Sequence, residues 1–301
     1  MNTTVPELPP DPTPARRRAL VLGGGGSTGN AWLIGVVAGL FDAGLDVTAA
    51  DVTIGTSAGA TAAAQFAGAS PPGLFAAALE NPPQHTGPTR NPGVPVTDHL
   101  ARVTEIIAAA GDAADMRRRM GAAALDLDAA SDGTWSTRWR AIVAARLPRP
   151  EWPRRTVLMT AVDARSGEPV VFDRTTGVDL VDAVAASCSS SLPYRIGESR
   201  YLDGGYRRNE NADLASGCGR VLVLSPFGGR SLHPSTWRMQ LSAQVDELRA
   251  GGSTVETIVP SRDSVHLFGA NAMDLSLRPA AAQAGYDRGG ALAERLIGFW
   301  R

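Results

Sequence analysis

Short apolar runs alternate with longer amphipathic stretches along the chain from residue 18 onward. Residues 18–22, Arg-Ala-Leu-Val-Leu, run straight into glycines, which is typical of a buried strand that enters a tight turn. Apolar residues then recur at helical spacing over 32–41, and Gly44 stands where a helix often ends. Residues 51–54 and the alanine-rich stretch up to Gly68 repeat this strand and helix. The order predicts parallel strands joined by right-handed crossovers.

The rest of the chain continues this pattern without an internal repeat or a second type of composition. It predicts, in chain order, mostly helix over 98–147, strands at 156–162 and 169–172, a helix over 178–187, an irregular stretch over 189–206, strands at 220–225 and 254–259 with a helix between them, and a last helix over 279–299. We therefore expect an α/β fold with three α/β/α layers and a mainly parallel central sheet.

The proline distribution suggests how the chain is divided. We expect a single domain over residues 16–301, preceded by a disordered leader over 1–15 that holds five prolines. Residues 81–95 hold five more prolines and two glycines, and they are predicted to form a long irregular loop. With the helices that follow, this loop is expected to form a lid or helical insertion over about 81–150.

The composition narrows the classes of protein to which the chain can belong. With 301 residues, 44% of them hydrophobic, and a net charge of -1, the chain can bury a large core, and nucleic acid is not expected as a partner. No apolar run approaches the roughly 20 residues of a membrane span, and no secretory signal is present, so a cytoplasmic location is expected. Cys188 and Cys218 are too few for a disulfide scaffold or a four-cysteine zinc site. No metal or cofactor is expected.

The segment Gly55-Thr56-Ser57-Ala58-Gly59 fits the G-x-S-x-G nucleophile elbow. That motif places a serine on a sharp strand-to-helix turn, where flanking glycines avoid a clash and the hydroxyl projects clear of the sheet. The predicted strand before this segment and the predicted helix after it provide the required context. The N–H of Ala58, at the start of that helix, can face a developing oxyanion.

The segment Gly24-Gly25-Gly26-Ser27-Thr28-Gly29 allows two interpretations. It satisfies the dinucleotide fingerprint G-x-G-x-x-G, but that site needs an acidic residue at the end of the second strand, and Asp51 lies at the wrong end. The other interpretation is an oxyanion hole, because consecutive glycines expose N–H groups at a helix N-terminus. Loops after neighbouring parallel strands meet at one edge of the sheet, so we favour an oxyanion hole beside Ser57.

A serine nucleophile needs a base, and the residues alone leave its identity open. Asp203-Gly204-Gly205 offers a carboxylate in a flexible loop, although such a sequence is often a plain turn. The histidines available for a triad are His85, His99, His233 and His266. Of these, His266 lies late in the chain, where an α/β-hydrolase would carry its histidine.

Taken together, the glycine loop, the serine elbow and the Asp-Gly-Gly segment resemble the patatin-like phospholipase family in order and spacing. The approach to Asp203 through residues 185–193, Ala-Ala-Ser-Cys-Ser-Ser-Ser-Leu-Pro, is similar as well. This resemblance implies a Ser–Asp dyad, with Ser57 as nucleophile and Asp203 as base, and with Gly24, Gly25 and Gly26 in the oxyanion hole. Members are acyl hydrolases that cleave lipid esters through an acyl-enzyme without a metal.

The sequence departs from the family pattern at Thr28, where Arg or Lys is usual, so the glycine loop carries no cation of its own. Simple ester hydrolysis is therefore expected more than a preference for anionic headgroups. Two alternatives stay open: a Ser57–Asp203–His266 triad in another hydrolase fold, and a non-catalytic protein that binds lipid or nucleotide. Peripheral membrane contact is a further expectation, since three arginines lie between Met116 and Met120, although a solvated helix face is the commoner cause of such a pattern.

Overall fold

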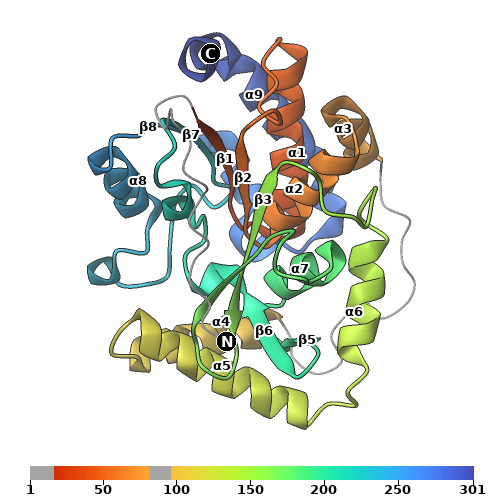
Figure 1. Cartoon of the computed structure of the whole chain (residues 1–301), viewed down its shortest axis with the longest axis vertical. Coiled ribbons are helices and arrows are strands. Elements are labelled where there is room, and N and C mark those ends of the chain that lie inside the picture. Colours follow the sequence, from red (N-terminus) through yellow and green to blue (C-terminus); the bar gives the residue numbers. More distant parts are fainter. Residues whose placement is uncertain (1–16, 81–95) are drawn as a thin grey trace.

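The central sheet of the protein is largely parallel (Figure 1). The computed structural model describes residues 17–80 and 96–301, so the predicted leader over 1–15 and the predicted loop over 81–95 lie outside the described residues. The parallel strands run in the order β3-β2-β1-β7-β8, with bounds β1 Arg18–Leu22, β2 Val52–Gly55, β3 Thr156–Asp163, β7 Arg220–Leu224 and β8 Thr254–Ile258. Every strand expected in this part of the sheet is present.

An antiparallel extension lies on the β3 side of the sheet. Strand β6 (Ser199–Asp203) pairs with β3, β5 (Tyr194–Ile196) pairs with β6, and β4 (Pro169–Phe172) also pairs with β3. The prediction of an irregular stretch over 189–206 is therefore wrong. Serines, a proline and a glycine hide these two short strands in the sequence, and β6 owes its strand conformation to its pairing with β3.

Helices cover both faces of the sheet, because side chains along each strand alternate between two apolar clusters. In β1, Leu20 and Leu22 face the cluster under one helical layer, whereas Ala19 and Val21 face the other cluster. The first layer consists of α1 (Gly26–Asp42), α2 (Ala58–Gly68), α3 (Pro71–Leu79), α7 (Leu180–Ser187) and α9 (Arg278–Trp300). The second contains α8 (Leu241–Ala250) and the short 3-10 helix Ala212–Ala215. The three-layer α/β/α prediction is confirmed.

Helices α1 and α9 touch backbone to backbone along their length. A Cβ atom added to Gly35 or Gly39 would lie 2.0 or 2.2 Å from a carbonyl oxygen of α9, and one added to Gly285 or Gly289 would lie 2.3 Å from a carbonyl oxygen of α1. Such distances leave no room for any side chain larger than hydrogen. The C-terminal helix is therefore fixed closely against the helix that follows the glycine loop.

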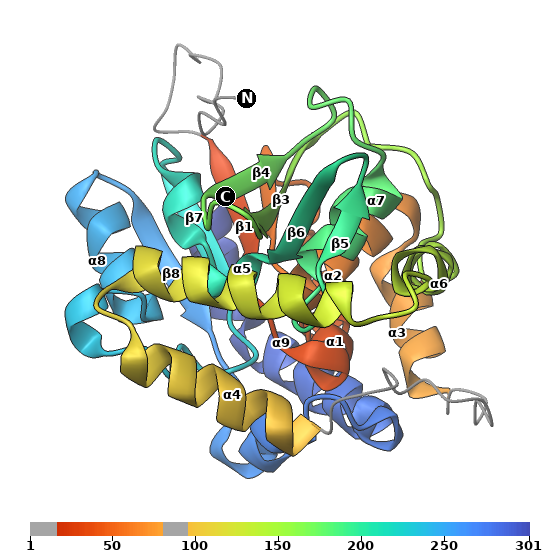
Figure 2. The same ribbon diagram turned by 90° about the horizontal axis from the view of Figure 1, so that it is seen from below.

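The helical stretch expected over 98–147 forms three helices, α4 (Val96–Ala109), α5 (Ala113–Ala129) and α6 (Trp135–Ala144). Helices α4 and α5 lie across the antiparallel end of the sheet (Figure 2), where a third apolar cluster joins them to β3 and β6. Within the described ranges, no helix is long and apolar enough to cross a membrane.

Candidate active site

Ser57 occupies the sharp turn between β2 and α2, as the elbow motif predicts. Its φ of 54° is a backbone conformation that non-glycine residues seldom adopt, so contacts on both sides must hold it. The Ser57 N–H donates to Ser187 Oγ at 3.0 Å, and the Ser57 carbonyl accepts from Cys188 Sγ at 3.2 Å. A Cβ at Gly59 would lie 1.9 Å from the Leu22 carbonyl oxygen, which explains the second glycine of the motif.

Asp203 ends β6 and is buried, with 8% of its surface exposed. Its N–H donates to the Ser189 carbonyl, and its Oδ1 accepts from the Gly205 N–H at 2.8 Å. Burial raises the pKa of Asp203 to about 6, although hydrogen bonds from Gly205 and from the Ser57 side chain oppose this rise. The structure thus places the Ser57 side chain close enough to the Asp203 carboxylate to lower its pKa.

Gly204 and Gly205 allow the segment after Asp203 to pack closely against the sheet. A Cβ at Gly204 would lie 2.1 Å from Thr160 Oγ1 on β3, and one at Gly205 would lie 3.1 Å from Asp203 Oδ1. A larger residue at position 204 would therefore push the carboxylate away from its place beside Ser57.

The glycine loop runs from the end of β1 into α1 beside the serine, since a Cβ at Gly24 would lie 3.6 Å from Ser57 Cβ. One part of the predicted oxyanion hole needs correction. The Gly24 N–H already donates to the Asn209 carbonyl at 3.0 Å, so it is not free for an oxyanion. The N–H groups of Gly25, Gly26 and Ala58 donate to no described residue, and they remain as candidate donors.

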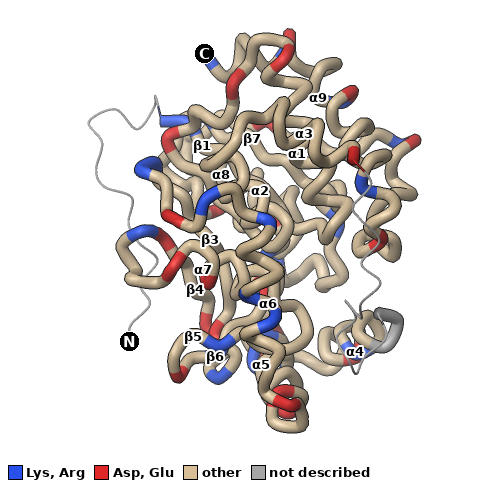
Figure 3. The backbone as a smooth tube through the Cα atoms, turned by 90° about the vertical axis from the view of Figure 1, so that its right-hand side faces the viewer, with Lys and Arg blue, Asp and Glu red and all other residues tan. Residues whose placement is uncertain are grey.

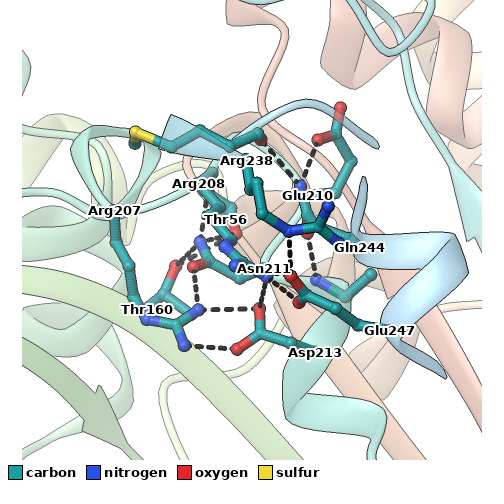
Figure 4. A network of polar contacts seen from close by, with 12 residues as sticks. Thr56, Thr160, Arg207, Arg208, Glu210, Asn211, Asp213, Arg238, Gln244 and Glu247 are labelled. Carbon is teal, nitrogen blue, oxygen red and sulfur yellow. Dashed lines mark hydrogen bonds and ion pairs between the residues drawn. The ribbon is translucent and has the colours of Figure 1, made fainter. Parts of the chain in front are cut away.

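Asn211 links the serine turn to the aspartate loop (Figure 4). This residue is fully buried, has a φ of 54°, and was not singled out by the sequence. Its Nδ2 lies 3.0 Å from Thr56 Oγ1, 3.2 Å from Thr160 Oγ1 and 3.1 Å from the Gly204 carbonyl oxygen. Asn211 therefore ties together the residue before Ser57, the neighbouring strand β3 and the residue after Asp203. Its place eight residues after Asp203, in an Asn-Glu-Asn segment, is the only signal in the sequence.

A buried carboxylate supports the glycine loop from the other side (Figure 4). Glu210, which is 1% exposed, accepts from Ser225 Oγ at 2.7 Å, Gln244 Nε2 at 3.2 Å and Asn209 Nδ2 at 2.9 Å. Burial raises the pKa of Glu210, and these three donors counteract the rise. The same Asn209 amide lies 3.3 Å from the Gly24 carbonyl oxygen. Glu210 thus orients the asparagine that fixes the first glycine of the loop.

The sequence profile of the patatin-like phospholipase family matches residues 20–216. This stretch includes the glycine loop, Ser57, Asp203 and Asn211. The chain belongs to the patatin-like phospholipase family. Members are lipid hydrolases, so the family supports hydrolysis of lipids by this patatin-like chain.

Solved structures similar to the chain include two bacterial proteins. VipD from Legionella pneumophila is 13% identical with a TM-score of 0.43, and the match covers 93% of this chain and 67% of VipD. ExoU from the type III secretion system of Pseudomonas aeruginosa, in complex with SpcU, is 16% identical with a TM-score of 0.39, covering 93% of this chain and 52% of ExoU. The chain thus spans about half the length of ExoU. No curated protein matches it.

None of the described histidines forms a hydrogen bond with Ser57 or Asp203. His266 is exposed on the 3-10 helix Arg262–Leu267, and His233 Nδ1 pairs with Ser231 Oγ at 2.7 Å. His99 lines a cavity beside Tyr206, and His85 lies outside the described residues. In the ranges 17–80 and 96–301, no imidazole hydrogen-bonds to Asp203, and no group of three or more His, Cys, Asp or Glu could hold a metal ion.

A small cavity opens next to the aspartate, between α4, α5 and the end of β6. Its lining is largely apolar and includes Ile106, Met120, Leu202 and Tyr206. Burial raises the pKa of the Tyr206 hydroxyl, and the charge of Asp203 raises it further. One lining residue, Leu202, directly precedes the candidate base Asp203 in the chain.

Proposed function

We propose that the protein is a serine acyl hydrolase that cleaves carboxylic esters of lipids through an acyl-enzyme on Ser57, with Asp203 as base. The observation that carries this proposal is that Ser57, on a strained strand-to-helix turn, lies beside a buried carboxylate whose pKa is raised to about 6 and is lowered in turn by the Ser57 side chain. A carboxylate with that pKa is ionised at neutral pH and is a stronger base than an ordinary aspartate. Membership of a family of lipid hydrolases supports the choice of ester.

In the acylation step, Ser57 Oγ attacks the ester carbonyl carbon while Asp203 accepts the hydroxyl proton. The carbonyl electron pair moves to oxygen, and the N–H groups of Gly25, Gly26 and Ala58 would stabilise that oxyanion. Collapse of the tetrahedral intermediate breaks the bond to the alcohol oxygen, which takes the proton from Asp203. In deacylation, water replaces the alcohol: Asp203 accepts its proton, and the fatty acid leaves as Ser57 Oγ regains a proton.

The apolar cavity between α4 and α5 is the candidate place for the acyl chain, because its lining includes Leu202, which directly precedes Asp203. It is small, so a long acyl chain would have to displace part of these helices. The arginines of α5 give little support for membrane contact. Arg118 and Arg119 both pair with Asp115, and acidic and basic positions are interspersed over the face in Figure 3.

The test is the intact mass of the protein after treatment with a fluorophosphonate, which phosphonylates activated serines. One adduct on the wild type and none on Ser57→Ala would support the proposal, and lipid esters of different chain length would then be compared as substrates. A folded wild type that gains no adduct would count against an activated serine. The non-catalytic binding protein would then become the better hypothesis, and NAD could be tested by its effect on the melting temperature.

A further inference from the structure

The first turn of α1 is held by an arginine from the far end of the chain. Arg278, the first residue of α9, donates from Nη1 to the Ser27 carbonyl at 2.7 Å and lies 3.2 Å from Ser27 Oγ. Its Nη2 donates to Asn30 Oδ1 at 3.2 Å. Ser27 directly follows Gly26, so the guanidinium is anchored at the residue next to a candidate oxyanion donor.

Other residues after position 216 also pack against the glycine loop. The Ala272 carbonyl accepts the Thr28 N–H at 3.0 Å, and a Cβ at Gly25 would lie 2.6 Å from Pro226 Cβ. The family profile ends at residue 216, so these contacts belong to a part of the chain that it does not cover. Because α9 packs directly on the backbone of α1, the position of Arg278 relative to the loop is closely fixed.

The positive charge of Arg278 is not balanced by a neighbouring acid. Among the described residues, no carboxylate forms an ion pair with Arg278. It lies at the N-terminal ends of both α1 and α9, where helix dipoles already favour anions over cations. Burial lowers the pKa of its guanidinium, and Arg146 lowers it further. A half-buried cation in such surroundings costs stability unless an anion forms nearby.

The glycine loop has no cation of its own that could stabilise an oxyanion. Residue 28 is a threonine, fully buried, whose hydroxyl has no hydrogen-bond partner among the described residues. The negative charge that would develop next to Arg278 is the oxyanion of the tetrahedral intermediate.

We propose that Arg278 is a positioning residue for ester hydrolysis, which fixes the N–H groups of Gly25 and Gly26 and adds positive potential to the oxyanion site. This inference rests on the proposed function. It predicts that the charge of Arg278 matters more in the transition state than in the binding of a neutral substrate.

The experiment compares Arg278→Gln and Arg278→Lys with the wild type, using p-nitrophenyl butyrate as a neutral ester. Arg288→Gln is the matched control, because Arg288 is also half-buried on α9 and also donates to a backbone carbonyl, that of Val259 at 3.2 Å. We expect Arg278→Gln to lower kcat about 10- to 100-fold with little change in KM, somewhat less than the loss of a direct oxyanion donor. Arg278→Lys, which keeps the charge, should retain about a fifth or more of the wild-type kcat.

Arg278→Gln with a kcat within about twofold of Arg288→Gln would overturn the inference. If Arg278→Gln lost its cooperative melting transition, the variant would not be folded, and Arg278→Lys would test the inference in its place. A folded Lys variant that lost more than about tenfold in kcat would show that hydrogen-bond geometry matters and not charge. A wild type that hydrolyses no ester and gains no fluorophosphonate adduct would overturn the proposed function, and this inference with it.

Discussion

The candidate nucleophile Ser57 and the candidate base Asp203 differ in how near in the sequence the residues that position each of them are. Ser57 follows a parallel strand, and the five residues from Gly55 to Gly59 contain most of what the turn requires. Asp203 ends an antiparallel strand whose place depends on β3 and on the Ser189 carbonyl. Ser187 and Cys188 also hold the serine turn, but the segment around Ser57 carries more of its own geometry than the segment around Asp203. Substitutions at positions far from the dyad in the sequence should therefore displace Asp203 more than Ser57.

Asn211 offers the strongest perturbation of this kind, because its amide joins the two sides. Asn211→Ala should lower kcat/KM for an ester about 10- to 100-fold and reduce the free energy of unfolding by about 2–3 kcal/mol, since buried partners are left unsatisfied. Ester kinetics and chemical denaturation measure the two effects. Asn271→Ala is the control, because that exposed asparagine donates only to the His266 carbonyl. Equal effects of the two substitutions would refute a joining role for Asn211.

The raised pKa of Asp203 predicts a cost in stability. The native state holds its proton up to a pKa of about 6, whereas the unfolded state loses it near the ordinary 3.8. Stability from this group is therefore complete below pH 3.8 and is lost as pH rises through 6. Asp203→Asn should remove this loss, so that the variant is more stable than the wild type by up to about 3 kcal/mol at pH 8.

Thermal melting at several pH values checks this prediction. The advantage of Asp203→Asn should shrink as pH falls from 8 to 4. A variant that is less stable than the wild type across this whole range would mean that the carboxylate is not strained by burial.

The smallest effect is expected at His266, which is exposed and makes no hydrogen bond with the dyad. His266→Ala should leave kcat/KM for an ester within about twofold of the wild type, because the Ser57 side chain and not an imidazole acts on the Asp203 carboxylate. A loss of several hundredfold would instead favour the Ser57–Asp203–His266 triad.

The sequence predicts best where a segment carries its own pattern. The apolar run of β1 before glycines, and the elbow between β2 and α2, led to the correct elements because both strands are buried on two faces. Strand β6 escaped prediction because its pairing with β3 and β5, and not its own sequence pattern, makes it a strand.

The contacts of the site were harder to foresee. Nothing in the glycine loop indicates that the Gly24 N–H is bonded to the Asn209 carbonyl, since these residues meet only in the folded chain. Arg278 reaches Ser27 across 251 positions in the sequence, through the packing of α9 on α1. The sequence therefore predicted which residues form the candidate dyad, but not the residues that hold it in place.

The central claim is that Asp203 activates Ser57, and the rate of fluorophosphonate labelling as a function of pH tests it most directly. Intact mass follows the reaction of the wild type and of Asp203→Asn between pH 5 and pH 9. The account predicts that the wild-type rate rises with pH to a plateau above an inflection near pH 6, where Asp203 loses its proton. The Asp203→Asn rate should be at least about 100-fold lower and should lack that inflection. Equal rates and equal pH profiles for the two proteins would contradict the account.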